Sequence, residues 1–365
     1  MDYIHKGVIE GDGIVDTTQS ITDTSRLKVL PSDDGFHLNN AEAGNFEWWY
    51  FDIIDFHNNV ILKVVAHLGT DPLRRAFYPQ LALSIQTGGT RHGLARRYSL
   101  SDFHGSRGIC DVRFKDEFHV MYEPSNGDIL YHLSINTDEF KARLTFRSEI
   151  EGWKPLGDEV SIVRGGKQAA FSWIIPVPKA RVAGAFDFNS KTYELDRALG
   201  YHDHNYWKVG EGNKLFVDDV LSKWYWGRAF ADDYMIVFMD TCFKQRSVRS
   251  FMLAKANRIM QSSNNLIEVS PSGFRRDEVS KIRYPSEITI RSIEEHNPFQ
   301  VILKAKGLID RRDLLEGVNP VITWLIKYLV SRPAYYGIWA DSSLNIAGEE
   351  IKGIGIYECM VFRNR

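Results

Sequence analysis

Residues 49–67 read WYFDIIDF-HNN-VILKVVAH. Aromatic and β-branched side chains dominate both halves, as they do in strands that pack one face against a core. The polar triplet His57-Asn58-Asn59 separates the halves and has the composition of a turn. The stretch therefore predicts two antiparallel strands joined as a hairpin.

Short runs of the same kind return along the whole chain, separated by Gly, Asn, Asp or Pro. They cover residues 80–86, 111–114, 118–122, 129–135, 140–148, 170–176 and 181–186, then 224–230, 235–243, 248–255, 266–269, 287–293, 299–305 and 355–362. This spacing is typical of an antiparallel sandwich or barrel, so the expected fold class is all-β. One helix is predicted over 321–330, after Asn319-Pro320 and before Arg332-Pro333.

Length and composition predict two domains. The chain has 365 residues, of which 44% are hydrophobic, and a single core rarely grows beyond about 250 to 300 residues. The strand pattern is interrupted by the polar run at 189–191. We therefore expect an N-terminal arm over 1–35, either packed or mobile, a first domain over 36–195 and a second over 196–365.

Charge and cysteine usage narrow the class of partner. The net charge is −2 with acids and bases interspersed, so no nucleic-acid partner is expected. Cys110, Cys242 and Cys359 show no pairing pattern, which favours a reducing, cytoplasmic location. No signal peptide and no run of about 18 apolar residues is evident, so no membrane span is expected, although peripheral membrane contact stays open. Oligomeric state is not predicted.

Chemically reactive side chains are concentrated in two short stretches. Residues 201–205 read YHDHN, and residues 224–228 read WYWGR. Imidazoles, a carboxylate, a carboxamide, a guanidinium and aromatic rings at this density exceed what strand formation requires, so we place the candidate site here.

Five motifs resemble one known family when taken together and in order. They are FEWWYFD at 46–52, FSW at 171–173 with 176–181, GYHDHN at 200–205, WYWGR at 224–228 and GIGIYE at 353–358. The set resembles the hydroxyneurosporene synthase and AttH-like superfamily, which includes carotenoid 1,2-hydratases and the lipocalin-like pericyclases often called Diels-Alderases. The resemblance implies two lipocalin-like antiparallel β-barrel or sandwich domains, a hydrophobic pocket in or between them, and chemistry without a cofactor. The sequence itself has no dinucleotide fingerprint, P-loop or H-E-x-x-H zinc motif.

One departure from the family argues against carotenoid hydration. Carotenoid hydratases carry a His two positions before the tryptophan that matches Trp173, and this chain has Phe171 there. Tyr201-His202-Asp203 matches their Tyr-x-Asp segment, but the continuation His204-Asn205 is more similar to the AttH and pericyclase branch.

Asp203 is the first candidate for catalysis. A carboxyl group among aromatic rings is poorly solvated, stays protonated more readily and can donate a proton near neutral pH. The alternative is a structural role, as a turn cap or in a buried ion pair with Arg228. Arg228 and Tyr201 are candidate donors to a developing oxyanion. The alternative for Arg228 is a structural role that ties the edges of the sheet together.

His202 and His204 are further catalytic candidates, and alternation in a strand puts both on the face opposite Asp203. A single pocket can therefore receive the Asp203 carboxylate or the two imidazoles, but not both, if the strand is regular. A zinc site would need a third ligand that the His-x-His spacing does not supply, so no metal is expected.

The predicted substrate-binding residues include one acid and several aromatic side chains. Glu47 is expected to accept a hydrogen bond that orients His67 or Arg228, or to form a structural charge pair, which we favour. Asn205 is a further predicted substrate-binding residue. Four tryptophans either line the ligand or fill the core: Trp49, Trp173, Trp224 and Trp226.

These features predict a cofactor-independent cyclase or isomerase acting on a small hydrophobic substrate, a polyene, polyketide or terpenoid. Dehydration can start the reaction, and confinement of a flexible substrate can lower its barrier by several kcal/mol. A carotenoid 1,2-hydratase and a non-catalytic lipid carrier are the two alternatives.

Overall fold

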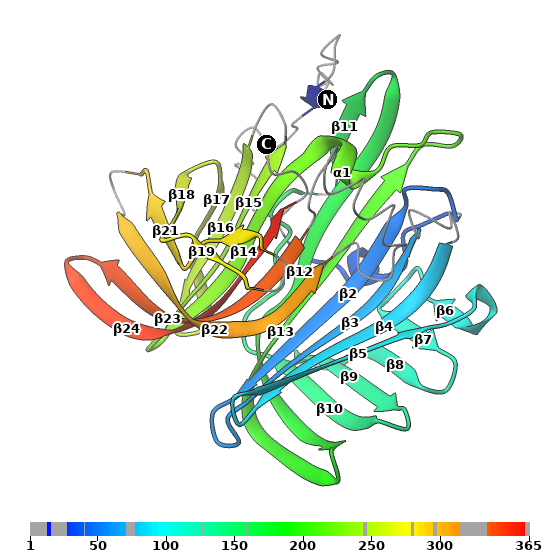
Figure 1. Ribbon diagram of the computed structural model, residues 1–365, viewed down its shortest axis with the longest axis horizontal. Helices are drawn as coiled ribbons and strands as arrows, with labels where there is room; N and C mark the ends of the chain where they lie inside the picture. The colour runs from blue at the N-terminus through cyan, green and yellow to red at the C-terminus, as the bar shows by residue number, and fades with distance from the viewer. Residues whose placement is uncertain are drawn as a thin grey trace. The chain divides into compact units, whose positions relative to one another are not determined.

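The structure is a computed structural model of the 365-residue chain. It describes residues 13–15, 28–39, 41–70, 77–125, 127–157, 159–243, 247–278, 281–294, 298–313 and 334–361. The chain divides into two compact units, Met1–Phe216 and Val217–Arg365. Each is built on one large antiparallel sheet that curls into a barrel-like domain, which confirms the all-β, lipocalin-like fold class (Figure 1).

The first unit contains thirteen strands in one sheet. They are β1 (Gly13–Val15), β2 (Phe46–Asp55), β3 (Val60–Thr70), β4 (Phe77–Thr87), β5 (Thr90–Arg97), β6 (Phe103–Gly105), β7 (Asp111–Phe114), β8 (Phe118–Pro124), β9 (Ile129–Asn136), β10 (Phe140–Ser148), β11 (Val160–Arg164), β12 (Lys167–Phe188) and β13 (Lys191–Val209), with 3-10 turns η2 (Pro31–Asp34) and η3 (Leu100–Asp102). The order is β5-β4-β3-β2-β13-β12-β10-β9-β8-β7-β6, and β11 joins β1 to β12.

The predicted hairpin is confirmed as β2 and β3, which pair from Phe46 with Gly69 to Asp55 with Val60. The turn is stabilised locally, because the Asp55 carboxylate accepts the backbone N–H of His57 at 3.0 Å. Asn59 takes a left-handed φ of 51°, which asparagine tolerates better than most residues.

β13 is the strand that positions the candidate site. One edge pairs with β12 and the other with β2 over residues 199–207. The predicted domain boundary at 195/196 lies inside this strand, and the first unit extends to Phe216. The ladder with β12 shifts register on both sides of Val177, where Pro176 and Pro178 lack the N–H that a regular ladder needs.

Part of the predicted N-terminal arm is packed on the first unit. Lys28 bridges to Trp153, and Asp34 is 1% exposed. Residues 28–39 therefore contribute a buried carboxylate to a unit whose first long strand begins only at Phe46.

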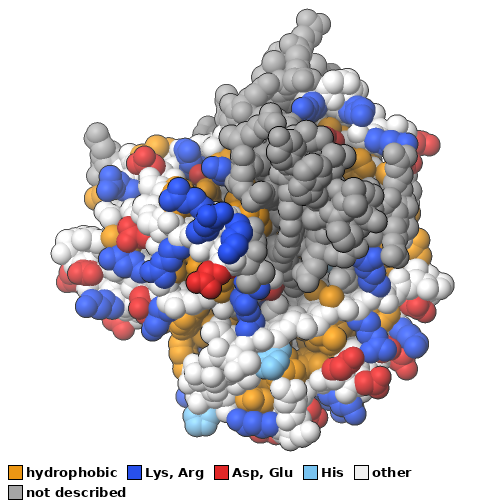
Figure 2. Space-filling model, viewed as in Figure 1, with side chains coloured by type: hydrophobic (Ala, Val, Ile, Leu, Met, Phe, Trp, Pro, Cys, Tyr) orange, Lys and Arg blue, Asp and Glu red, His pale blue; other side chains and the backbone are white. Residues whose placement is uncertain are grey.

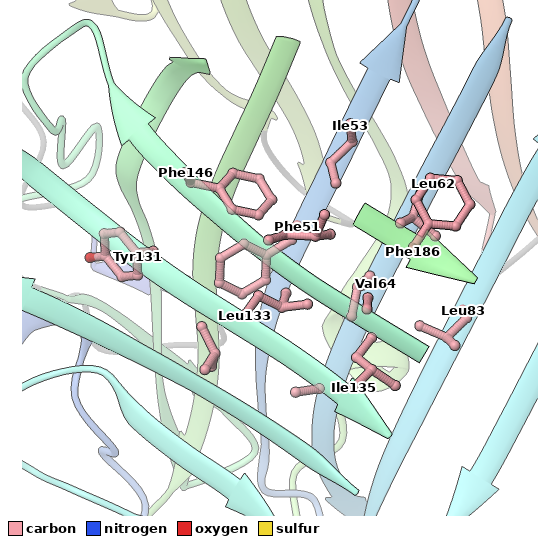
Figure 3. Close-up of a cluster of buried hydrophobic side chains, with 14 of the residues drawn as sticks. Phe51, Ile53, Leu62, Val64, Leu83, Tyr131, Leu133, Ile135, Phe146 and Phe186 are labelled. Carbon is pink, nitrogen blue, oxygen red and sulfur yellow. The ribbon is translucent and has the colours of Figure 1, made fainter. Parts of the chain in front are cut away.

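The core of the first unit lies on the inward face of its sheet. Figure 3 shows how side chains from β2, β3, β4, β9, β10 and β12 meet there. Phe51 packs edge-on against Phe146 and Tyr131, with ring centroids 5.3 and 6.4 Å apart. The buried, inward-facing positions of β9 and β10 alternate with partly or fully exposed ones, as expected for a sheet with one face on the core.

The second unit has a nine-stranded sheet in the order β17-β16-β15-β14-β24-β23-β22-β21-β18, and a separate hairpin β19-β20. Its elements are α1 (Val217–Val220), β14 (Leu221–Ala231), β15 (Tyr234–Phe243), β16 (Ser247–Lys255), β17 (Arg258–Asn264), β18 (Ile267–Ser272), β19 (Arg275–Arg276), β20 (Arg283–Tyr284), β21 (Glu287–Ser292), β22 (Phe299–Asp313), β23 (Ala334–Ile346) and β24 (Glu349–Val361). It has its own core, which includes Phe238, Phe251, Ile290 and Tyr357. The helix predicted over 321–330 lies outside the described residues.

The surface is electrostatically mixed. Figure 2 shows basic and acidic side chains interspersed over the described part of the face it draws. In the ranges that the structure describes, no helix combines the length and the hydrophobicity needed to cross a membrane.

Candidate functional site

Alternation along β13 divides the candidate residues between two faces of the first sheet. Tyr201, Asp203 and Asn205 lie on one face, whereas His202 and His204 lie on the other with the core. The structure therefore separates Asp203 from both histidines. A role in which Asp203 works together with His202 or His204 at one substrate is wrong, because adjacent side chains of this regular strand point in opposite directions.

Asp203 is held by three donors. Its Oδ2 accepts the Trp173 indole N–H at 3.0 Å and the Tyr201 hydroxyl at 2.8 Å, and its Oδ1 accepts the Asn205 amide at 3.0 Å. The side chain is nearly buried, at 5% exposed. Since these three neighbours donate, the arrangement favours the ionised carboxylate over the protonated acid.

A second polar pair lies next to Asp203 on the same face. Register places Tyr50 opposite Asp203 and Asp52 opposite Tyr201, and the Tyr50 hydroxyl donates to Asp52 at 3.1 Å. Lys63 lies opposite Asp52 on β3, with its ammonium 5.4 Å from the centre of the Tyr50 ring. This outward face of β2, β3 and β13 thus carries a buried row of polar side chains.

The inward face carries a different cluster, centred on Asp34 from η2. Asp34 Oδ2 accepts the Tyr131 hydroxyl at 2.8 Å and lies 2.9 Å from His202 Nε2. His202 Nδ1 lies 2.9 Å from the Tyr50 carbonyl oxygen, and its ring stacks on Phe51 with centroids 3.9 Å apart. Burial alone would raise the pKa of Asp34, but the charge and hydrogen bonds of His202 and His204 outweigh it and hold that pKa well below its usual range.

Glu47 and His204 continue this cluster toward the protein surface. His204 Nε2 lies 2.9 Å from Glu47 Oε1, and His204 Nδ1 lies 3.3 Å from Asp34 Oδ1. Burial would lower the pKa of His204, yet its hydrogen bonds with Asp34 and Glu47 raise it to about 9. The pKa of Glu47 is lowered despite its burial, because His204 and His37 interact with its charged form.

The predicted role of Glu47 as a partner of His67 is wrong. His67 lies opposite Trp48 in the β2–β3 ladder, whereas Leu68 lies opposite Glu47. Side chains of successive residues alternate, so His67 points to the other face. Glu47 instead accepts the backbone N–H groups of His37 and Leu38 at 2.8 and 3.1 Å.

The predicted aromatic residues do not form one wall. Trp49 lies on the inward face, where it stacks on His204 at 4.7 Å and donates its N–H to the Asp34 carbonyl at 3.1 Å. Trp173 lies on the outward face beside Asp203 and packs edge-on against Trp153 at 5.9 Å. These two tryptophans therefore serve different faces of the sheet.

The remaining predicted residues lie in the second unit. Trp224, Trp226 and Arg228 occupy alternate positions of β14 and share one face of its sheet. Arg228 is fully buried, with its guanidinium 5.0 Å from the centre of the Phe230 ring. Glu358 lies opposite Trp226 on β24 and accepts the Tyr335 hydroxyl.

One hollow of about 580 Å³ is described on the first unit, at the ends of β9, β10 and β12. Its lining includes Asp116, Lys141, Arg143 and Asp187, and none of the predicted site residues. It therefore does not supply the hydrophobic pocket that the sequence predicts.

Sequence reasoning missed Asp34, His37, Tyr131 and Cys110, which the fold gathers around His202 and His204. Buried Cys110 lies beside Asp34, and burial raises the pKa of its thiol. These positions carry no local motif, because they lie 71 to 170 positions from His202 and His204 in the printed sequence. The one usable signal was the acidic pair Asp33-Asp34 shortly before the first long strand.

The chain is similar to one curated relative and to several solved structures. No family model matches it. It is 26% identical over 267 residues to hydroxyneurosporene dehydrogenase of Chlorobaculum tepidum. This alignment covers 64% of the present chain and 67% of the relative.

Three solved structures share the fold at low identity. CghA in complex with Sch210972 matches with a TM-score of 0.60 at 12% identity, over 92% of this chain and 97% of the other. Kievitone hydratase of Nectria haematococca matches with a TM-score of 0.59 at 14% identity, over 93% and 95%. An AttH-like protein of Nitrosomonas europaea matches with a TM-score of 0.62 at 14% identity, over 91% and 96%. The chain is thus similar in sequence to a relative named for hydroxyneurosporene and shares its fold with these three structures, in line with the resemblance that its motifs show.

Proposed function

We propose that the protein is a cofactor-independent cyclase or isomerase, of the pericyclase or Diels-Alderase kind, that acts on a hydrophobic polyene, polyketide or terpenoid intermediate. The observation that carries the proposal is the nearly buried Asp203 carboxylate, held by Trp173, Tyr201 and Asn205. CghA, which is complexed with Sch210972, has the same fold, and the resemblance of the motifs to the lipocalin-like pericyclases supports the reaction class.

Asp203 is the proton-transfer group in this proposal. Its carboxylate accepts a proton from an acidic C–H or O–H of the substrate, and the resulting acid returns the proton to another carbon, which shifts a double bond without changing the mass. If the proton is instead delivered to a leaving hydroxyl, water departs and a reactive polyene remains. Proton transfer of this kind contributes typically 10²- to 10⁴-fold to a rate.

The donors around Asp203 keep its carboxylate in one orientation. A carboxylate fixed by Trp173 and Tyr201 does not have to reorganise when charge moves, which is the basis of electrostatic preorganisation. The roles predicted for Trp224, Trp226 and Arg228 stay predictions for one face of the second unit's own sheet, with the aromatic rings as apolar surface and the guanidinium as a polar anchor.

Hydration is the second candidate function. It is supported by the fold of kievitone hydratase and by the carotenoid-related name of the curated relative. The set Trp173, Tyr201 and Asp203 matches the hydratase-like motifs, but Phe171 occupies the place of their histidine and lies on the same face of β12 as Trp173. The apolar ring at this position favours cyclisation or isomerisation over addition of water.

The test is turnover of candidate linear polyenes, polyketides and terpenoids by the purified protein, followed by mass and absorbance. Asp203→Asn keeps the shape of the side chain and should lower turnover by about 10²- to 10⁴-fold. Asp196→Asn is the matched control, because Asp196 lies on the same strand with its side chain 95% exposed, and it should leave turnover unchanged.

The outcomes separate the candidates. An unchanged mass with altered absorbance supports isomerisation or cyclisation, and a gain of one water supports hydration. Substrate binding without conversion by the wild-type protein would identify a lipid carrier instead. Full turnover by Asp203→Asn would remove Asp203 from the mechanism.

A further inference from the structure

Three side chains with metal-binding atoms converge on the inward face of the first sheet, from three separate segments. His37 comes from the loop after η2, Glu47 from β2 and His204 from β13. One ligand atom of each lies within 4.8 Å of the others. Glu47 and His204 are fully buried, whereas the His37 side chain is 23% exposed.

The distances are those of ligands around one ion. Two ligands each about 2.1 Å from zinc lie about 3.0 Å apart at a right angle and about 3.4 Å apart at the tetrahedral angle. Glu47 Oε1 lies 2.9 Å from His204 Nε2 and 3.5 Å from His37 Nδ1. These two distances therefore fit ligands of one ion, and the ligand atoms of His37 and His204 lie within 4.8 Å of each other.

The surroundings have the features of a second shell. The other ring nitrogen of His204 faces the Asp34 carboxylate at 3.3 Å, the carboxylate–histidine–metal arrangement that orients a ligand imidazole. Backbone N–H groups of His37 and Leu38 hold the Glu47 carboxylate. Asp34 therefore holds His204 in position, and the two backbone N–H groups hold Glu47.

One of the proposed ligand atoms has no hydrogen-bond partner. Buried His37 Nδ1 makes no hydrogen bond with any described residue. It lies 3.5 Å from Glu47 Oε1, close enough for an ion pair but longer than a normal hydrogen bond. Buried polar atoms without a partner are rare in native proteins and call for a ligand or an ion.

We propose that His37, Glu47 and His204 bind one divalent transition-metal ion, with zinc as the best match and water in the fourth position. Two imidazoles and one carboxylate are a recognised zinc donor set. The site lies on the face of β13 opposite Asp203, so it is separate from the proposed reaction. Bound there, the ion links residues 28–39 to β2 and β13.

The test uses the full-length protein, freed of metal by chelation and free of any affinity tag. Wild type should bind one Zn²⁺ per chain, measured by calorimetry and elemental analysis, and Co²⁺ should give the visible absorption of a four- or five-coordinate site. His37→Gln should weaken Zn²⁺ binding at least about 10- to 100-fold, the loss typical even of a second-shell change. His57→Gln is the control, because His57 is exposed in the β2–β3 turn, and it should bind as wild type does.

A crystal of the wild-type protein soaked in Zn²⁺ gives an answer that does not depend on any variant folding. The anomalous peak should lie about 2.0 to 2.2 Å from His37 Nδ1, Glu47 Oε1 and His204 Nε2. A peak elsewhere, no stoichiometric binding, or equal affinity in wild type and a folded His37→Gln protein would overturn the proposal and leave a histidine–carboxylate clasp without metal. The result is independent of Asp203 turnover.

Discussion

At the residue scale, one step along β13 decides what a side chain can do. Asp203 meets an indole, a phenol and an amide, whereas His202 and His204 on either side meet carboxylates among core residues. Both environments are buried, and the histidine face pairs imidazoles with carboxylates. Sequence adjacency therefore says little about shared chemistry in a strand.

The indole N–H of Trp173 should matter to turnover. Trp173→Phe keeps a ring beside Asp203 but removes the 3.0 Å hydrogen bond. A hydrogen bond to a charged group contributes about 1.5 to 3 kcal/mol, so kcat should fall about 10- to 100-fold if that bond is used in the transition state.

Trp207→Phe is the control for this change. It removes a comparable indole hydrogen bond, to the Leu215 carbonyl at 2.9 Å, without touching Asp203. Steady-state kinetics of the two variants decide the matter, and an equal loss of kcat in both would mean that the Trp173 effect is merely structural.

The buried histidine–carboxylate cluster predicts a pH-dependent stability of the metal-free protein. The folded pKa of His204 is about 9 against an ordinary value of 6.5, so its contribution is complete below pH 6.5 and is lost as pH rises through 9. The pKa values of Glu47 and Asp34 are lowered, so their contributions are present above their ordinary values of 4.5 and 3.8 and are lost at lower pH. Stability should be greatest between pH 4.5 and 6.5.

Urea unfolding across this range checks the sign. Wild type should lose roughly 3 kcal/mol of first-unit stability between pH 6 and pH 9.5, from a shift of about 2.5 pKa units. His204→Gln has no such proton to lose and should show a much flatter profile. Parallel profiles for the two proteins would assign the pH effect to other groups.

At the element scale, the segment 28–39 acts as a clasp across strands of the first sheet. η2 supplies Asp34 to Tyr131 on β9 and to His202 on β13, and the following loop supplies backbone donors to Glu47 on β2. These contacts join strands that are far apart in the sequence. The clasp therefore holds in place the strand that carries Asp203.

Asp34→Asn should destabilise the first unit strongly. The change leaves His202 and His204 facing an uncharged amide, and breaking a buried charge pair on one side typically costs about 3 to 5 kcal/mol. Asp128→Asn is the control, because Asp128 pairs with Arg147 at 2.9 Å and both side chains are exposed, at 46% and 61%. It should cost about 1 kcal/mol or less. Equal midpoints in urea for the two variants would contradict the clasp.

At the scale of the whole molecule, the chain contains two hydrophobic cores, one in each compact unit. The cores share no residue, and each is enclosed by its own sheet. Cooperative unfolding is a property of a single packed core, so a chain with two cores is not expected to unfold in one step.

Core truncations should therefore move different transitions. Leu62→Ala in the first core and Ile290→Ala in the second each remove a buried side chain and should cost about 2 to 5 kcal/mol. In scanning calorimetry each variant should lower the melting temperature of one transition and leave the other in place. A single transition that both variants shift equally would show one cooperative unit.

The strand pattern and the hairpin at β2 and β3 were accessible from the sequence. They depend on local alternation, on turn chemistry and on motifs of adjacent residues, which the chain carries wherever it folds. The same alternation also predicted that Asp203 points to one face of its strand and that His202 and His204 point to the other.

The three-dimensional fold, and no local pattern, determines which distant residues meet on each face of the sheet. Asp34, His37 and Tyr131 reach the histidines through strand order and register, and Trp49 and Trp173 are assigned to different faces of the sheet in the same way. The end of the first unit at Phe216 follows from β13 pairing with β2 as well as with β12. Long-range pairing of this kind has no local signature, because its free energy comes from contacts between segments that are separated by most of a domain.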